Sequence, residues 1–429
     1  MPRPSALAWS GLLLATACFA AGPIPEDKKS PVRDEEWMNT RMGRDAMLHS
    51  SQQLDVEGKL VDIPGRLLAV EIALGGKVVL VKTTTVLASF EATTLKLIQK
   101  TDYPIVKGGG SMHGLAISAD GATAVVSGGR THLYVAQVAA DGKFTWGSSI
   151  DVAGGAKNVN PLGIALTKDG RFAYVALSMA NTLAKVDLKT GKVVASVDVG
   201  ICPYGVALSP DERTVYVSNF GGARPEATDV TESSGGSLVA VDPRAVALRG
   251  TLSVVDVSGA PKAVAQLAVG LHPSELLLAD EGRTLYVANV GADSVSVVDT
   301  VARKVARTLP TKPDGDLPWG TLTDGLALSA DGKTLYTANA GVNAIGCTDL
   351  TQPTFPTRFI PSGWYPGAVR THGSALFVAN VRNGLQRVEL PTTTAAVTVP
   401  AHFPTRPRTT AAAPRTQSSW LRSSPRRAS

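Results

Sequence analysis

The chain has 429 residues, of which 44% are hydrophobic and 18% are charged, and its formal net charge is +6. This composition is typical of a globular protein, and the length is ample for a buried core. Eight arginines and one glutamate lie from Val381 onward, so the rest of the chain is close to neutral. Because no basic stripe runs through the body of the chain, we expect no nucleic-acid partner. No internal stretch has the length of a membrane span, so we expect no transmembrane segment.

The N-terminus reads as a signal peptide over residues 1–20. Arg3 supplies the positive start, residues 6–19 form the apolar segment, and small residues at 15–21 suit cleavage. This pattern predicts export across a bacterial inner membrane, to the periplasm or beyond. Lipidation at Cys18 is a weaker alternative, because the leucine usually found three residues before such a cysteine is missing. Residues 21–57 are expected to form a linker.

One motif then returns along the chain: an apolar strand, an Asp-Gly-type turn and a Tyr-Val-Ala-Asn-type strand. Its copies begin near Gly65, His113, Pro161, Pro203, Pro273, Thr323 and Pro366. All but one of the intervals are 42 to 50 residues, which is the period of a β-propeller with four strands in each blade. We therefore predict an all-β propeller over residues 58–381 with seven blades. Six blades is the alternative, because the last repeat is incomplete.

The ring is expected to close through residues 58–63, a strand that would pair with the final blade and remove two exposed sheet edges. Third strands are expected at residues 182–187, 237–242 and 294–299. Two residue types recur at fixed repeat positions, namely Asn219, Asn289, Asn339 and Asn380, and Asp187, Asp242, Asp299 and Asp349. Because a residue that every copy needs is usually needed by its turn, we interpret both series as structural. Cys202 and Cys347 fall in non-adjacent repeats and are not expected to form a disulfide.

Candidate ligand-binding residues are sparse. The long segment 221–236 breaks the repeat period and contains Arg224, Glu226 and Asp229, and loops of this length often carry function. Three aromatic residues lie in other long connections at the same end of the blades: Trp319, Trp364 and Tyr365. We expect these residues to line one face of the ring. His113 and His272, each just before an inner strand, could also reach the channel, although satisfying loop backbone groups is the commoner role. No catalytic residue and no metal site are expected.

After Val381 the repeat pattern stops. Residues 382–429 are rich in Ala, Pro, Arg, Ser and Thr, without apolar periodicity, and contain no lysine. We expect a disordered basic tail, because such a segment could not offset the entropy of ordering itself. A membrane-attracted tail and a frameshifted translation product are the alternatives.

The repeats resemble the YVTN family of bacterial β-propellers, which is related to the YncE family. The motifs that carry this resemblance are residues 216–219, 286–289, 336–339 and 377–380. Segments 218–225, 233–244 and 360–367 also resemble a subgroup whose propeller is commonly followed by a phosphoesterase domain of the alkaline-phosphatase superfamily. No cluster of Asp and His metal ligands follows Asn380, so we expect the propeller half alone. A phosphoesterase domain is then a possible partner.

Three functional hypotheses follow. The first is an exported, non-catalytic, monomeric propeller without a cofactor, which binds a small ligand or a protein, or docks a phosphoesterase. The second is a lactonase-like or other metal-dependent hydrolase that would hold a divalent metal in the channel. For that activity we would expect unique carboxylates at the inner strand ends, where Glu71 and Glu275 lie. The third is a truncated product of a propeller–phosphoesterase gene.

Overall fold

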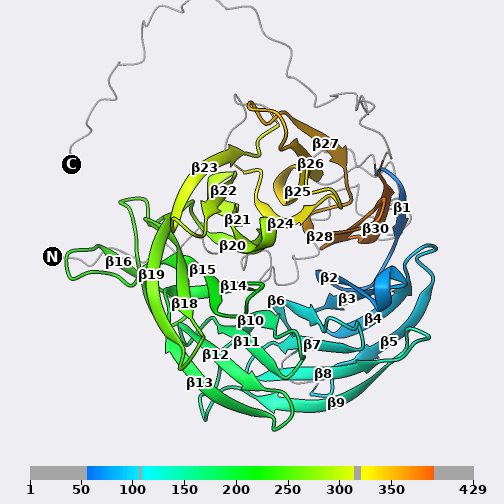
Figure 1. Cartoon of the computed structure of the whole chain (residues 1–429), viewed down its shortest axis with the longest axis horizontal. Coiled ribbons are helices and arrows are strands. Elements are labelled where there is room, and N and C mark those ends of the chain that lie inside the picture. Colours follow the sequence, from blue (N-terminus) through cyan, green and yellow to red (C-terminus); the bar gives the residue numbers. More distant parts are fainter. Residues whose placement is uncertain (1–55, 106–108, 314–319, 391–429) are drawn as a thin grey trace, which may run out of the picture. The chain divides into compact units, whose positions relative to one another are not determined.

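The computed structural model describes residues 56–105, 109–313 and 320–390. In this part of the chain, seven four-stranded antiparallel sheets are arranged around a central axis (Figure 1). The prediction of a seven-bladed β-propeller is confirmed, and the alternative of six blades is wrong. No helix in the described ranges is long and apolar enough to cross a membrane.

Each blade begins with an inner strand beside the axis and proceeds outward. Blades 1 to 3 are β2 (Leu67–Ala73), β3 (Val78–Thr83), β4 (Val86–Glu91) and β5 (Leu97–Asp102); β6 (Gly110–Ile117), β7 (Thr123–Gly128), β8 (His132–Val138) and β9 (Phe144–Asp151); and β10 (Pro161–Leu166), β11 (Phe172–Leu177), β12 (Thr182–Asp187) and β13 (Lys192–Asp198). Blades 4 to 6 are β14 (Ile201–Leu208), β15 (Thr214–Gly222), β18 (Gly250–Asp256) and β19 (Lys262–Val269); β20 (Pro273–Ala279), β21 (Thr284–Asn289), β22 (Ser294–Asp299) and β23 (Lys304–Pro310); and β24 (Thr323–Leu328), β25 (Thr334–Asn339), β26 (Ala344–Asp349) and β27 (Thr357–Pro361). Short 3-10 turns occur at η3 (Leu74–Gly76), η4 (Asp280–Gly282), η5 (Val290–Ala292) and η6 (Ala340–Val342).

Blade 7 takes its strands from both ends of the described chain. Its first three strands are β28 (Pro366–His372), β29 (Ala375–Asn380) and β30 (Gly384–Glu389), and β1 (Lys59–Val61) is the fourth. β1 pairs antiparallel with β30, with Leu60 opposite Gln386. Leu67 of blade 1 and Phe377 of blade 7 belong to one buried apolar cluster. The predicted ring closure by residues 58–63 is therefore confirmed.

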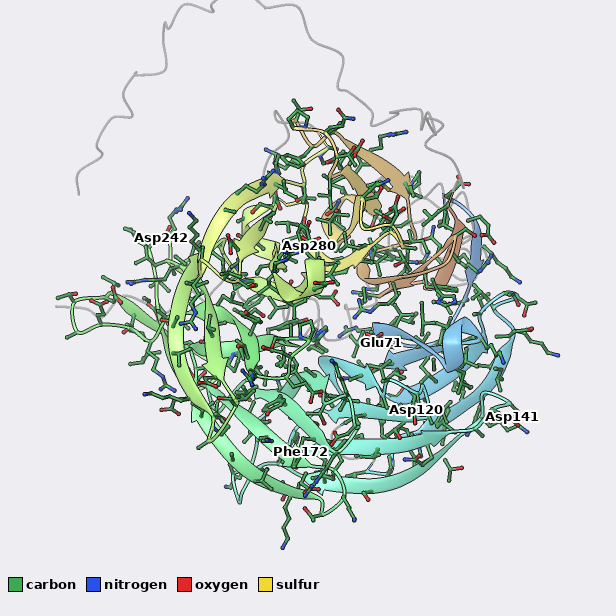
Figure 2. All side chains as sticks on the ribbon, in the orientation of Figure 1. Glu71, Asp120, Asp141, Phe172, Asp242 and Asp280 are labelled. Atoms are coloured by element: carbon green, nitrogen blue, oxygen red, sulfur yellow. The ribbon has the colours of Figure 1, made fainter. Side chains whose placement is uncertain are left out.

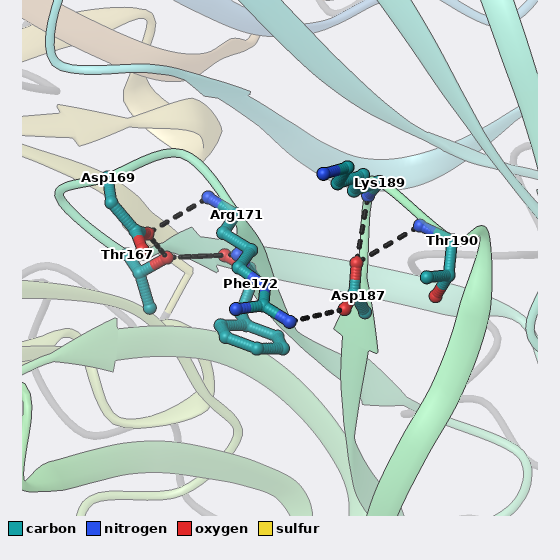
Figure 3. A network of polar contacts seen from close by, with 7 residues as sticks. All are labelled: Thr167, Asp169, Arg171, Phe172, Asp187, Lys189 and Thr190. Carbon is teal, nitrogen blue, oxygen red and sulfur yellow. Dashed lines mark hydrogen bonds and ion pairs between the residues drawn. The ribbon is translucent and has the colours of Figure 1, made fainter.

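The Asp-Gly-type turns share one hydrogen-bond pattern, which Figure 3 shows in blade 3. The hydroxyl of Thr167 donates to Asp169 Oδ1 at 2.6 Å, and Asp169 Oδ1 accepts from the backbone N–H of Arg171 at 2.9 Å. Thr167 Oγ1 also accepts from the N–H of Phe172 at 3.0 Å. The same three bonds recur at Ser118 and Asp120, Ser209 and Asp211, and Ser329 and Asp331.

The recurring Asn and Asp residues have structural contacts. Asn219 and Asn289 are fully buried and donate from Nδ2 to hydroxyls of the neighbouring third strand, for example to Ser253 at 2.9 Å. Their backbone is extended rather than left-handed, so the geometry differs from the expected turn role. Asp187 ends its strand and accepts from the N–H groups of Lys189 and Thr190 (Figure 3).

The expected third strand at residues 237–242 is wrong. The third strand of blade 4 is β18, whereas β17 (Ser237–Ala240) pairs with β16 (Thr231–Ser234) in a separate hairpin. A third strand is buried on both faces, as β18 is, but the side chain of Leu238 is 57% exposed. The segment 221–236, expected to be a loop, is thus partly strand. The thiols of Cys202 and Cys347 are both free, as predicted.

Candidate functional site

The seven inner strands align residue by residue through their pairing with the second strands. At one position six of the seven blades carry Gly or Ala, whereas blade 5 carries Glu275. A Cβ at Gly114, Gly163 or Gly205 would lie 2.0 to 2.4 Å from a carbonyl oxygen of another inner strand. The repeat therefore needs a small residue here because the inner strands pack closely, and Glu275 departs from that rule.

Two residues later in the strand, the copies carry Ala or Leu except in blades 1 and 7, which carry Glu71 and Arg370. The guanidinium of Arg370 donates from Nε and Nη2 to Glu71 Oε1, at 2.8 and 2.6 Å. Its Nη1 lies 2.7 Å from Glu275 Oε1, and Glu275 Oε2 accepts from the N–H of Leu326 at 2.9 Å. We call Glu71, Arg370 and Glu275 the charged cluster. It links inner strands of blades 5, 6, 7 and 1.

The charged cluster is largely removed from water, and the pKa values of Glu275 and Arg370 respond to this. Burial raises the pKa of Glu275, although the charge of Arg370 opposes this effect. Burial tends to lower the pKa of Arg370, but the two carboxylates outweigh it and the pKa is raised. Arg370 is therefore a permanent cation held by two acids.

A cavity of about 330 Å³ lies beside the charged cluster, within the size range of small-ligand pockets. All three members of the cluster line it, and Glu71 lies on the inner side of blade 1 (Figure 2). The cavity follows β6 from His113 to Ser118. The exposed lining surface is more polar than apolar, although aliphatic side chains also line the cavity, namely Ile72, Leu115, Ile117, Ile164, Val206 and Leu276.

A row of four rings connects the two candidate histidines. His113 stacks on Tyr204 with ring centroids 5.0 Å apart, Tyr204 lies 5.9 Å from Phe220, and Phe220 stacks on His272 at 4.6 Å. His113 lies within β6 rather than in the loop before it. Burial, followed by the charges of Lys82 and Arg370, lowers the pKa of His113 to about 3, and burial lowers that of His272 to about 4. Both imidazoles are therefore neutral at pH 7.

Asp324 adds an acid whose protonation changes near neutral pH. Burial raises the pKa of Asp324 to about 7, with a further contribution from Glu275, while a hydrogen bond from Ser274 opposes it. The pKa of Tyr204 is raised by burial and by the nearby Asp324, Glu275 and Tyr365. Asp324 and Tyr204 occupy the same register position as His113 in their inner strands.

The structure places Arg224 and Asp229 away from the cavity, in the segment that carries the β16–β17 hairpin. Arg224 donates to the carbonyl oxygens of Val199 and Asn181, both at 3.2 Å. Asp229 pairs with Arg249 at 2.7 Å. Glu226 is exposed. The hairpin projects from the outer edge of the ring (Figure 1). Arg224 and Asp229 fasten the insertion, and none of the three residues lines the cavity.

The structure describes two of the three aromatic candidates. Trp319 lies outside the described residues. Trp364 packs against Val56 and Leu60 near the closing strand, and the guanidinium of Arg382 lies 5.4 Å from its ring centroid. Tyr365 lies close enough to Tyr204 to contribute to the raised pKa of Tyr204.

Sequence reasoning missed Arg370, Asp324 and Tyr204, and it considered Glu71 and Glu275 only as metal ligands. A signal was present for Glu71, Glu275 and Arg370, because these three residues break the repeat at inner-strand positions. The position of Asp324 and Tyr204 varies from blade to blade, so it gave no such signal. In the described ranges, no group of three or more His, Cys, Asp or Glu side chains is arranged to hold a metal ion.

Comparisons with known proteins show the fold and nothing finer. No family model matches the chain, and no curated protein matches it. Among solved structures, Kuenenia stuttgartiensis hydrazine synthase has a TM-score of 0.60 at 18% identity, covering 78% of this chain and 98% of that one. Virginiamycin B lyase from Staphylococcus aureus has a TM-score of 0.58 at 12% identity, with coverage of 78% and 98%. A catalytically inactive form of that lyase with quinupristin gives 0.56 at 11%, with coverage of 78% and 99%.

Proposed function

We propose that this protein is an exported propeller that binds a small ligand in its central cavity and does not transform it. The observation that carries this proposal is the charged cluster at the cavity wall. Other blades build the same positions from Gly, Ala or Leu, so the fold does not require Glu71, Glu275 or Arg370. Removing charges from water is costly, and buried charges that the fold does not need are common at functional sites.

Export is part of the proposal and rests on the signal pattern of residues 1–20. Mass spectrometry of the protein expressed in a bacterial host tests export. We expect a product without residues 1–20 in the periplasm. A full-length product in the cytoplasm would contradict export. Membership of the YVTN family is also part of the proposal and rests on the repeated motifs at residues 216–219 and 286–289. Binding to a separate phosphoesterase rests on the resemblance of the insertion to the phosphoesterase-linked subgroup.

The alternative of a metal-dependent hydrolase is less well supported. Its two candidate ligands, Glu71 and Glu275, already hold the guanidinium of Arg370 between them. Both oxygens of Glu275 are engaged, one by Arg370 and one by the N–H of Leu326. A metal would have to displace these contacts, whereas a ligand can enter the cavity without disturbing them.

Thermal-shift screening tests the binding proposal. The panel would contain small amines, carboxylates, sugars, phosphate esters and lactones. We expect at least one compound to raise the Tm of the wild type, because a ligand that binds only the folded state stabilises it. Ala116→Phe, at the cavity wall, should abolish the shift, whereas Ala263→Phe, on the exposed outer strand β19, should retain it.

Leu276→Trp is a second cavity-filling variant, for use if Ala116→Phe does not fold. A shift that survives in the folded cavity variants would place binding elsewhere. A complete absence of shifts in the wild type would contradict the proposed ligand-binding function. Turnover of a lactone by the wild type, lost after treatment with a chelator, would favour the hydrolase.

A further inference from the structure

The carboxylate oxygens of Glu71 and Glu275 do not all accept hydrogen bonds within the charged cluster. Glu71 Oε1 accepts two hydrogen bonds from Arg370, and both oxygens of Glu275 are engaged. Among the described residues, Glu71 Oε2 has no hydrogen-bond partner. The Glu71 side chain is 20% exposed and lines the cavity, so this oxygen is an acceptor available to a ligand.

The cavity wall also carries more negative than positive charge. Two carboxylates face one guanidinium, and His113 contributes no charge at pH 7 because its pKa is about 3. The ammonium of Lys82 is not part of the wall: it donates to Ser111 Oγ at 3.1 Å and to backbone carbonyls of β6. Arg370 is shared between Glu71 and Glu275, so it does not fully neutralise Glu71. Glu71 would therefore repel an anion that enters the cavity.

Aliphatic side chains offer apolar contact beside the polar part of the wall. Aliphatic side chains from blades 1 to 5 surround the space, namely Ile72, Leu115, Ile117, Ile164, Val206 and Leu276. Burying apolar surface against them contributes roughly 25 cal/mol for each Å² removed from water. A volume of about 330 Å³ limits the ligand to a small molecule.

We propose that the ligand is a small organic cation, an ammonium group on an apolar body, whose head donates to Glu71 Oε2 while its body contacts the aliphatic wall. This inference rests on the proposed binding function and specifies its ligand class. Hydrogen bonds from an ionised donor to a carboxylate are roughly twice as strong as neutral ones. The cavity should therefore bind an ammonium compound more tightly than a neutral compound of the same shape.

Titration calorimetry with three molecules of matched shape tests the inference: benzylammonium chloride, benzyl alcohol and sodium benzoate. We expect wild-type protein to bind benzylammonium at least tenfold more tightly than benzyl alcohol, and benzoate most weakly. Glu71→Gln keeps an oxygen for Arg370 but removes the negative charge, and should weaken benzylammonium binding about tenfold or more. Asp141→Asn removes an exposed acid and should leave binding unchanged.

The outcomes separate this inference from the proposed function. Equal binding of benzyl alcohol and benzylammonium, or preference for benzoate, would overturn the cation while leaving a ligand-binding cavity. Unchanged affinity in Glu71→Gln would overturn the role of Glu71 Oε2. If Glu71→Gln does not fold, the order of the three molecules on wild-type protein still decides the ligand class. The absence of any ligand in the wider screen would instead contradict the proposed function itself.

Discussion

At the scale of single residues, Lys82 is a fully buried lysine at a repeat position where other blades carry a small residue. Two other blades carry a serine at its position, and the hydroxyls of Ser127 and Ser218 each donate to a carbonyl oxygen in the inner strand of the next blade. Lys82 makes the equivalent contact from its ammonium to the carbonyl oxygens of His113 and Gly114. It therefore replaces a small hydroxyl as a link between blades 1 and 2.

Burial lowers the pKa of Lys82 well below its ordinary value of 10.5, which gives a testable pH dependence. Between the lowered pKa of the folded state and 10.5, the unfolded chain binds more protons, so stability rises with pH. One proton corresponds to at most about 1.4 kcal/mol for each pH unit. We expect the unfolding free energy of wild type minus that of Lys82→Met to rise by about 1 to 2 kcal/mol between pH 8 and pH 10.

Urea unfolding of both proteins at the two pH values measures this difference, and the other titrating groups cancel between them. A difference that does not change with pH would mean that Lys82 is not desolvated in the folded protein.

At the scale of elements, the sequence predicted the hairpins but not the insertion. The Asp-Gly turns could be recognised because their chemistry is local: Ser or Thr, then Asp two residues later, satisfy the turn within six residues. The third strand of blade 4 could not be assigned this way. Residues 237–242 and 250–256 both alternate like strands, and only packing against other blades shows that β18 is the buried one.

The turns also predict a loss of stability in acid. A hydrogen bond from the preceding Ser or Thr lowers the pKa of Asp120, Asp169, Asp211 and Asp331 below 3.8. A carboxyl whose pKa is depressed in the folded state stabilises the protein above the unfolded value, and this contribution is lost as pH falls through the folded value. Replacing all four by Asn keeps an acceptor oxygen and removes the charge.

We expect the wild type to exceed this fourfold variant in urea midpoint at pH 6 and to lose most of the advantage at pH 3. Circular dichroism at both pH values records the midpoints. An advantage of the same size at pH 3 would show that the carboxylate charge does not matter to the turns.

At the scale of the whole molecule, repetition made the fold predictable and the site hard to find. Seven copies of one pattern give the blade number, and residues 58–63 complete the seventh blade as expected. Glu71, Glu275 and Arg370 lie far apart in the sequence and meet only because the ring brings their strands together. Arg224 looked distinctive in the sequence, yet its partners are two backbone carbonyls and the exposed carboxylate of Asp198.

The ring closure itself predicts a global effect from one backbone bond. Pro cannot donate a hydrogen bond to a neighbouring strand, so Lys59→Pro should weaken the pairing of β1 with β30, where Lys59 faces Arg387 in a hydrogen-bonded pair. Arg307→Pro is the matched control, because Arg307 has the same register position in the outermost strand of blade 5. Lys59→Ala controls for the contact of the Lys59 side chain with the carbonyl oxygen of Thr94.

Both proline variants lose a backbone bond to the neighbouring strand, but only Lys59→Pro loosens the pairing that joins the two ends of the ring. We therefore expect Lys59→Pro to lower the Tm by several degrees more than Arg307→Pro or Lys59→Ala. In Lys59→Pro, hydrogen exchange should become faster in β30 and in β2 of the adjoining blade, whereas Arg307→Pro should affect blade 5 alone. Equal Tm values for the two proline variants would mean that contacts between blades 1 and 7, such as Leu67 with Phe377, hold the ring without the closing strand.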